Sequence, residues 1–329
     1  MSQRCPWVNV TPRIVQGLII CFSYRLASIE IIWIDVRFAT ENKVDESLWM
    51  THSQITRTYR KIIGKLTGPD NTVLKRRLDR LYAAYLKTAQ YFYKGWMQRV
   101  CARYGDSVQN LKRIARMAEL EMVVPDGEKV DAATQQVDVV VRELCHKTLI
   151  YLGDLARYRV LQRTKDRKWE TAVAYYALAN ELIPESGFGH HQSAVIYDEM
   201  GDHLQVVYHL YRAMACEKPH PNAPANLERH FRDLQKQKGG GTKHALVTWF
   251  VKLHAYYYQG KEFNERKELE NEVDHRLAVA MKSGTHLDSD TDLLKIVLIN
   301  ITSYVVGQQK IQGRILRYLV AHGYYANIG

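Results

Sequence analysis

Residues 151–159 read Tyr-Leu-Gly-Asp-Leu-Ala-Arg-Tyr-Arg and lie at the centre of the stretch that decides the fold, from about Gln135 to Phe231. Two copies of a helix-hairpin pattern follow. In each copy, small residues let two helices approach, a bulky residue fills the gap and a proline ends the helix. The copies consist of Ala172, Tyr176, Ala179 and Pro184, and of Val206, Leu210, Ala213 and, one place late, Pro219. One such unit cannot bury its own apolar face, so flanking helices must complete the core.

The spacing within each copy is typical of the second helix of a tetratricopeptide repeat, and the copies lie roughly one repeat length apart. Between them, a shorter helix carrying Ala194 and Tyr197 is expected, followed by a turn at Gly201. No stretch alternates over several strands, so the chain is predicted to be all-α. Apolar faces and chain breaks predict helices over about 44–66, 72–104, 110–120, 135–162, 189–200, 226–236, 243–259, 263–282 and 293–308.

Composition and charge favour a globular protein with acidic partners. Of the 329 residues, 46% are hydrophobic and 25% charged, which is a globular rather than a disordered composition. The formal net charge is +11. A basic chain favours phosphopeptides, nucleic acid or an acidic protein surface, although an ordinary basic soluble protein has the same composition.

The cysteine and histidine patterns predict neither a disulfide framework nor a metal site. Five scattered cysteines include no CxxC pair, which suits a reducing cytoplasmic or nuclear compartment. His190 and His191 are adjacent, so on a helix they point about 100° apart, and Asp198 and Glu199 have no ligand spacing to them. The sequence has no Walker loop, HExxH motif or nucleophile elbow. No cofactor, metal or enzymatic activity is therefore expected.

Changes along the chain divide it into four parts. Residues 1–42 differ from the rest and are interpreted as a divergent or mis-annotated segment. Arg25 and Glu30 interrupt its apolar run, so a membrane-spanning helix is not expected. Residues 43–238 form the main helical domain, and glycines at 239–241 form a flexible break. Residues 243–310 are expected to form C-terminal helical hairpins, and 311–329 form an unassigned tail.

Several segments together resemble one protein family. They are LGDLARYR at 152–159, the hairpin stretch from Ala172 to Phe231, Val44 to Trp49, and Val247 to His254. Their order is similar to that of the Est/SMG family, which comprises telomerase-associated "ever shorter telomeres" proteins and SMG-type adaptors of nonsense-mediated mRNA decay. The resemblance extends from about Lys43 to Gln309. It implies a 14-3-3-like helical array with tetratricopeptide-type hairpins, followed by α-helical hairpins in an α-α superhelix.

The resemblance also implies a phosphoserine site at Arg157 and Tyr158. In 14-3-3 proteins, a Gly-Asp-x-x-Arg-Tyr segment presents an Arg and a Tyr to a bound phosphoserine, and residues 153–158 have the same order. A guanidinium donates two parallel hydrogen bonds to a phosphate, and a phenol adds a third. The alternative is a surface or salt-bridged arginine paired with Asp154 or Glu143.

One arginine leaves part of a phosphate charge uncompensated, so a second helix must bring another cation. The resemblance places it among Arg57, Arg60 and Lys61, and the sequence does not select one of them. Gln54 falls where relatives have a lysine. His191 and Gln192 fall where a polar side chain of 14-3-3 proteins holds the peptide backbone; a polar helix surface explains this pair equally well.

These observations lead to a functional hypothesis with two alternatives. The chain is expected to be a non-catalytic phosphoserine-peptide adaptor in nonsense-mediated decay, in cytoplasm and nucleus. Its expected partners are the phosphorylated RNA helicase of that pathway and a second family member as heterodimer. The first alternative is a telomerase-associated protein binding RNA or single-stranded telomeric DNA, for which 75–80 and 236–243 supply basic clusters. The second is a helical-repeat scaffold without a phosphate pocket. Larger family members carry a nuclease domain, and no matching acidic cluster is present here.

Overall fold

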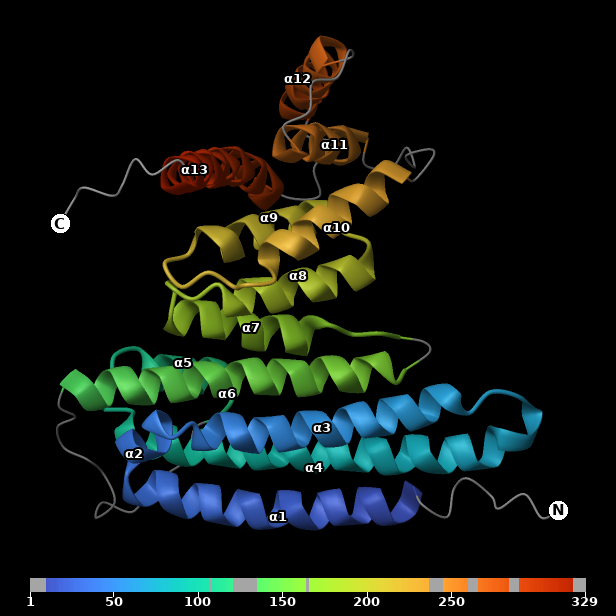
Figure 1. Cartoon of the computed structure of the whole chain (residues 1–329), viewed down its shortest axis with the longest axis vertical. Coiled ribbons are helices and arrows are strands. Elements are labelled where there is room, and N and C mark those ends of the chain that lie inside the picture. The colour runs from blue at the N-terminus through green and yellow to red at the C-terminus, as the bar shows by residue number, and fades with distance from the viewer. Residues whose placement is uncertain are drawn as a thin grey trace. The chain divides into compact units, whose positions relative to one another are not determined.

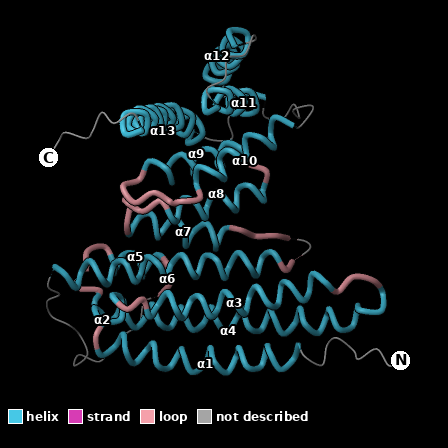
Figure 2. Tube along the Cα trace, in the orientation of Figure 1, coloured by secondary structure: helices cyan, strands magenta, loops and turns pink. Residues whose placement is uncertain are grey.

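The computed structural model describes residues 10–106, 108–120, 135–163, 166–236, 245–259, 266–283 and 290–321. Within these ranges the chain is helical and contains no strand, and one isolated bridge joins Ser186 to Lys218 (Figure 1 and Figure 2). The predicted all-α class is confirmed. The chain divides into two compact units, Met1–Ile183 and Pro184–Gly329.

The first unit combines four long helices with three shorter ones among the described residues. The connection between its third and fourth α-helices contains a short 3₁₀ turn, η1 (Pro69–Asn71). The α-helices are α1 (Val10–Ile34), α2 (Val36–Glu41), α3 (Val44–Lys65), α4 (Thr72–Tyr104), α5 (Leu111–Met117), α6 (Gln135–Leu161) and α7 (Glu170–Leu182).

Helices α3 and α4 form an antiparallel hairpin (Figure 1). Tyr59 stacks on Tyr82 with ring centroids 5.2 Å apart, and His52 lies 5.1 Å from Tyr93, so contacts that advance along α3 go backwards along α4. At the turn, Gly68 has a φ of +92°, which side chains of L-residues disfavour. The hairpin therefore depends on aromatic packing along its length and on a glycine at its end.

At one turn of α4 the buried face does not follow the spacing of its leucines. Leu81 fits an inward stripe by sequence, but its side chain is 48% exposed, whereas Tyr82 is 3% exposed. Buried positions step by three or four residues through Leu78, Tyr82, Tyr85 and Ala89, which follows one face of a 3.6-residue helix. Tyr82 faces inward because Tyr59 offers it a stacking partner.

Helices α3 and α6 run parallel and side by side (Figure 1). Near the start of α3, Lys147 Nζ donates to Glu46 Oε1 at 2.7 Å and lies 3.5 Å from Asp45 Oδ2. One turn later, Trp49 stacks on Tyr151 with centroids 4.3 Å apart and planes 10° apart. The contacts advance in the same direction along both helices, so their C-terminal halves also lie together.

The N-terminal helices pack against this core. Arg25 of α1 donates to His52 Nε2 from Nε at 3.1 Å, and Cys21 Sγ lies 3.4 Å from the same atom. Since Nε2 accepts, the ring proton is on Nδ1, which lies 3.0 Å from the Leu48 carbonyl oxygen. The interpretation of residues 1–42 as a divergent segment stays a prediction.

The second unit continues as helical hairpins. Gly201, with φ +73°, ends the first of its helices, and the Asp202 carboxylate accepts a hydrogen bond from the Gln205 amide at 3.1 Å and so caps the next. The expected turn is therefore present. The helices of this unit are α8 (Phe188–Met200), α9 (His203–Ala215), α10 (Ala223–Lys236), α11 (Ala245–Gln259), α12 (Arg266–Ser283) and α13 (Asp290–Ala321).

Two helices of this unit are longer than the sequence indicated. Helix α10 begins at Ala223 rather than near Asn226, because Pro224 fits the first turn, where its missing N–H costs nothing. Helix α13 continues to Ala321, past the expected end near Gln308. The predicted break at 239–241 lies outside the described residues. The predicted domain boundaries at 42/43, 238/243 and 310/311 stay predictions.

Among the described helices, none combines the length and the apolar character that crossing a bilayer requires.

Three buried histidines predict acid sensitivity. Burial lowers the pKa of His52, His190 and His254 to about 4. In the unfolded chain these rings take up protons near pH 6.5, so below that pH the unfolded state binds protons that the folded state excludes. We predict that the free energy of unfolding falls from about pH 7 to pH 5, by at most about 2 kcal/mol per histidine.

Urea denaturation across this pH range measures the effect. His254→Gln keeps a donor for Asn300, which lies 3.0 Å from His254 Nε2, and should flatten the profile. Replacement of the exposed His275 by Gln is the matched control. A stability that does not change between pH 7 and pH 5 contradicts the prediction.

Candidate functional site

Arg157 is held near the C-terminal end of α6 by a carboxylate and a phenol. Its side chain is 13% exposed, and Nη2 donates to Asp154 Oδ1 at 2.9 Å. The Tyr176 hydroxyl of α7 donates to the same oxygen at 2.6 Å and lies 3.4 Å from Arg157 Nε. Burial opposes the guanidinium charge, but Asp154 outweighs it and raises the pKa of Arg157. The Asp154 ion pair, which the sequence offered as an alternative to phosphate binding, is therefore present.

Gly153 makes this arrangement possible by letting α7 approach α6. A Cβ atom at Gly153 would lie less than 3 Å from three ring carbons of Tyr176, closer than carbon atoms pack. Tyr176 is fully buried against this backbone, and its hydroxyl reaches Asp154 one residue further along α6. The Gly-Asp pair therefore positions Tyr176, and Tyr176 and Asp154 together orient Arg157.

Two guanidinium groups from different helices meet at Tyr158. The Cζ atom of Arg157 lies 4.8 Å from the centroid of the Tyr158 ring, and that of Arg60, from α3, lies 5.8 Å from it. Burial raises the pKa of the Tyr158 hydroxyl, which therefore remains a protonated donor at neutral pH. The structure thus brings together two cations and a phenol, the donor types that a phosphate monoester accepts from.

The structure separates the three predicted cations of α3. Within the described part of the chain, Arg60 contacts Tyr158, whereas no contact to Tyr158 or Arg157 is found for Arg57 or Lys61. Arg57, Lys61 and Gln54 are all exposed. Phosphate binding by any of these residues stays a prediction.

His191 and Gln192 lie on α8 in the second unit. The His191 ring stacks on His220 with centroids 3.6 Å apart, and its Nε2 lies 2.7 Å from Asn226 Nδ2. His191 is buried and Gln192 is half-buried. Their predicted role in holding a peptide backbone is not tested by these contacts.

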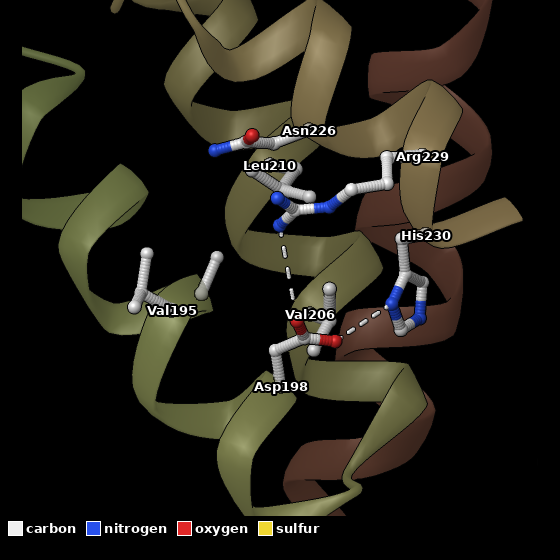
Figure 3. Close-up of a pocket in the computed structure, with 8 residues that line it drawn as sticks. Val195, Asp198, Val206, Leu210, Asn226, Arg229 and His230 are labelled. Atoms are coloured by element: carbon white, nitrogen blue, oxygen red, sulfur yellow. Dashed lines mark hydrogen bonds and ion pairs between the residues drawn. The ribbon is translucent and has the colours of Figure 1, made fainter. Parts of the chain in front are cut away.

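A small hollow between α8, α9 and α10, lined by both apolar and polar side chains, was not expected from the sequence (Figure 3). Asp198 Oδ1 lies 3.0 Å from His230 Nδ1, and its Oδ2 lies 3.9 Å from Arg229 Nη2. The hydrogen bond from His230 lowers the pKa of Asp198. Within the described residues, no group of three or more His, Cys, Asp or Glu side chains is placed to hold a metal ion. The acid of this hollow already has its partners inside the unit.

Sequence reasoning missed two contributors to the Arg157 site. It assigned Tyr176 only to the repeat core, although the hydroxyl is the closest hydrogen-bond partner of Asp154. It likewise gave Tyr82 only a core position, and burial raises the pKa of its hydroxyl to about 12 against the influence of Arg60 and Arg157. The signal in the sequence was the hydroxyl of Tyr176 at a repeat position expected to be buried. A buried phenol usually has a polar partner, so a nearby polar residue such as Asp154 could have been expected.

Two regions of the chain match known protein-family models. Residues 43–163 match the family model described as "Telomerase activating protein Est1", and residues 172–321 match "Est1 DNA/RNA binding domain". The chain is 23% identical over 273 residues to the nonsense-mediated mRNA decay factor SMG7 of Danio rerio, covering 81% of this chain and 22% of that protein. It is 24% identical over 164 residues to the telomere elongation protein est1 of Schizosaccharomyces pombe, covering 48% of this chain and 34% of that protein.

Two solved structures share the fold. One is described as "Crystal structure of Est1 and Cdc13", with a TM-score of 0.66, 12% identity, and coverage of 89% of this chain and 60% of that chain. The other is described as "Structure of the C. elegans SMG5-SMG7 complex", with a TM-score of 0.54, 13% identity, and coverage of 97% and 78%. The chain spans about a fifth to a third of the length of the curated relatives described above.

The close approach at Gly153 gives a stability prediction. We expect Gly153→Ala to lower the free energy of unfolding by about 1–3 kcal/mol, because the new methyl group displaces Tyr176 from a packed interface. Urea denaturation measures the change. Gly95→Ala in α4 is the matched control, since nothing lies within 4 Å of its added Cβ, and better helix propensity should leave stability equal or slightly higher. If Gly153→Ala is as stable as the parent, the proposed packing is wrong.

Proposed function

The chain belongs to the Est/SMG family, and on that premise we propose that it is a non-catalytic adaptor that binds phosphoserine peptides in nonsense-mediated mRNA decay. The observation that carries this proposal is the convergence of Arg60 and Arg157 on Tyr158 from two parallel helices. SMG7 of Danio rerio, whose alignment covers 81% of this chain but only 22% of SMG7 itself, is a nonsense-mediated mRNA decay factor.

The charges around Tyr158 are compatible with binding of a phosphate group. A phosphoserine carries about −1.5 to −2 charges at neutral pH. Asp154 offsets the charge of Arg157, and Arg60 adds a second cation that forms no ion pair within the described residues. Arg57 and Lys61 are exposed within one turn of Arg60 and keep the potential positive.

Asp154 has a positioning role in this proposal. It binds Nη2 of Arg157, and Tyr176 lies beside Nε, so one edge of the guanidinium is occupied by the protein. The hydrogen bonds to Tyr176 and Asp154 are made by Nε and Nη2 and not by Nη1. A guanidinium fixed in this way loses little side-chain entropy on binding an anion.

The proposed partners follow from the pathway and from the relatives. The phosphopeptide is assigned to the phosphorylated RNA helicase of nonsense-mediated decay. A second family member is a further proposed partner, since the solved relatives include a complex of SMG5 with SMG7. Such an adaptor would act in cytoplasm and nucleus.

A role in telomere maintenance is the second candidate function. The observation that favours it is the match of residues 172–321 to the Est1 DNA/RNA binding domain, together with the similarity to telomere elongation protein est1. Such a protein would bind RNA or single-stranded telomeric DNA without distinguishing a phosphorylated peptide from its unmodified form. A scaffold without a phosphate pocket would bind neither ligand.

Binding of a phosphoserine-centred peptide library, compared with the same library containing unmodified serine, tests the proposal. We predict a preference for the phosphorylated library that falls at least about tenfold in Arg60→Ala and in Arg157→Lys. The first change removes a charge, and the second keeps the charge but loses the two-pronged donor geometry. Isothermal titration gives the affinities.

Arg57→Ala and Lys61→Ala are matched controls, because they remove the same charge from the same helix without touching Tyr158. Their effect should stay below about threefold, as expected for exposed charges. Equal affinity of the parent protein for both libraries would reject phosphoserine binding.

A further inference from the structure

Positive charge is concentrated in the α3–α4 hairpin. From Gln54 to Lys94 the sequence contains ten Lys and Arg residues but only two acidic residues, Asp70 and Asp79. This segment therefore carries +8 of the formal net charge of +11 in 41 of 329 residues. Like charges held this close repel one another, so the folded hairpin maintains an electrostatic cost that an anionic ligand would relieve.

None of these ten cations forms an ion pair with any described residue. Elsewhere in the chain, ion pairs are common on helix surfaces, as between Arg266 and Glu270 at 2.7 Å or Arg142 and Asp138 at 3.5 Å. Within the hairpin, the contacts found for these cations are to aromatic rings, from Arg60 to Tyr158 and from Lys87 to Tyr91. Their charges are therefore available to a ligand.

Helix α4 arranges part of this charge as a stripe. Its residues, spaced by four, seven and seven positions, return to the same side of the helix: Arg76, Arg80, Lys87 and Lys94. The first three are exposed and Lys94 is half-buried. At a rise of about 1.5 Å per residue, the stripe is about 27 Å long.

The surface beside the stripe suits a thin, extended ligand. Ala83 and Ala84 are exposed between Arg80 and Lys87, so no bulky side chain stands between those cations. Tyr91 is 63% exposed, and Lys87 Nζ lies 5.7 Å from the centroid of its ring. An exposed aromatic ring among regularly spaced cations is the combination that binds an unpaired base beside its phosphates.

We propose that the α4 stripe binds a single strand of nucleic acid through its phosphodiester backbone, with Tyr91 stacking on one base. The stripe lies in the first unit, outside residues 172–321, which match the DNA/RNA binding domain. It also excludes Arg60, Arg157 and Tyr158, so it is independent of the proposed phosphoserine site. An acidic peptide is a less suitable ligand, because evenly spaced cations beside an exposed ring match the regular phosphates and bases of a single strand.

Fluorescence anisotropy with the full chain and a labelled 20-nucleotide oligouridine, at several salt concentrations, tests the proposal. The triple variant Arg76→Gln, Arg80→Gln and Lys87→Gln should weaken binding about tenfold or more. It should also reduce the slope of log affinity against log salt by about 2, because each lost phosphate contact on a single strand contributes about 0.7. Glutamine favours helix at these exposed positions, and circular dichroism verifies folding.

The matched control removes three exposed cations of α3, which lie off the stripe and, like the stripe cations, form no ion pair with any described residue: Arg57→Gln, Lys61→Gln and Lys65→Gln. Its affinity and salt slope should stay near those of the parent. Equal losses in both triple variants would show a response to net charge alone and overturn the stripe, as would an unchanged affinity in the first.

Three further measurements separate this proposal from its alternatives. Tyr91→Ala should weaken oligouridine and oligothymidine several-fold and leave a duplex of the same length unaffected; a duplex bound as tightly as the single strands would overturn the single-strand assignment. Arg157→Lys should leave oligonucleotide affinity unchanged. The phosphoserine proposal and the α4 stripe proposal can therefore fail independently of each other.

The triple variant of the stripe is also measured with the phosphoserine library. If it no longer binds this library but still binds oligouridine, the stripe belongs to the peptide site and the proposal is overturned.

Discussion

The parallel register of α3 and α6 is the constraint on which the candidate site depends. The stack of Trp49 on Tyr151 and the hydrogen bond from Lys147 to Glu46 fix this register near the start of α3. From the stack, Arg60 lies eleven residues further along α3 and Tyr158 seven further along α6. The four extra residues correspond to about 6 Å, which a long side chain leaning toward the helix N-terminus spans. Arg60 therefore reaches Tyr158 because the aromatic stack sets the starting point.

The Asp154–Tyr176–Arg157 network stabilises the fold with the same atoms that are proposed to orient Arg157 for a ligand. Asp154 is buried, so its charge requires the guanidinium and the phenol that surround it. The same contacts hold Arg157 in one orientation against Tyr158. The network also requires glycine at position 153, because a Cβ atom there would clash with the Tyr176 ring and keep its hydroxyl from Asp154. Changes at this network therefore have to be separated into effects on folding and effects on binding.

Helical periodicity predicted most of the helices from residue 44 onward, because regular apolar spacing marks the face that a helix buries, but α1 and α2 were not predicted. It failed where an interaction between helices decides the outcome. Leu81 fits an inward stripe by spacing, but Tyr82 is buried because Tyr59 stacks on it. Likewise, Arg57, Arg60 and Lys61 are equivalent as sequence, and only the register of α3 against α6 brings Arg60 to Tyr158. The Gly-Asp-x-x-Arg-Tyr segment marked Arg157 and Tyr158 as candidate residues, whereas the hydrogen bond from the Tyr176 hydroxyl to Asp154 follows only from the packing of α7 on α6.

A double-mutant cycle on Arg60 and Arg157 tests the central claim most directly. Phosphoserine-library affinities of the parent, Arg60→Ala, Arg157→Lys and the double variant give a coupling free energy, with the unmodified library as reference. If both guanidinium groups bind one phosphate, the single effects are not additive, and the coupling is predicted to exceed about 1 kcal/mol for the phosphorylated library alone. Additive effects, or equal coupling with both libraries, would contradict a phosphate shared between α3 and α6.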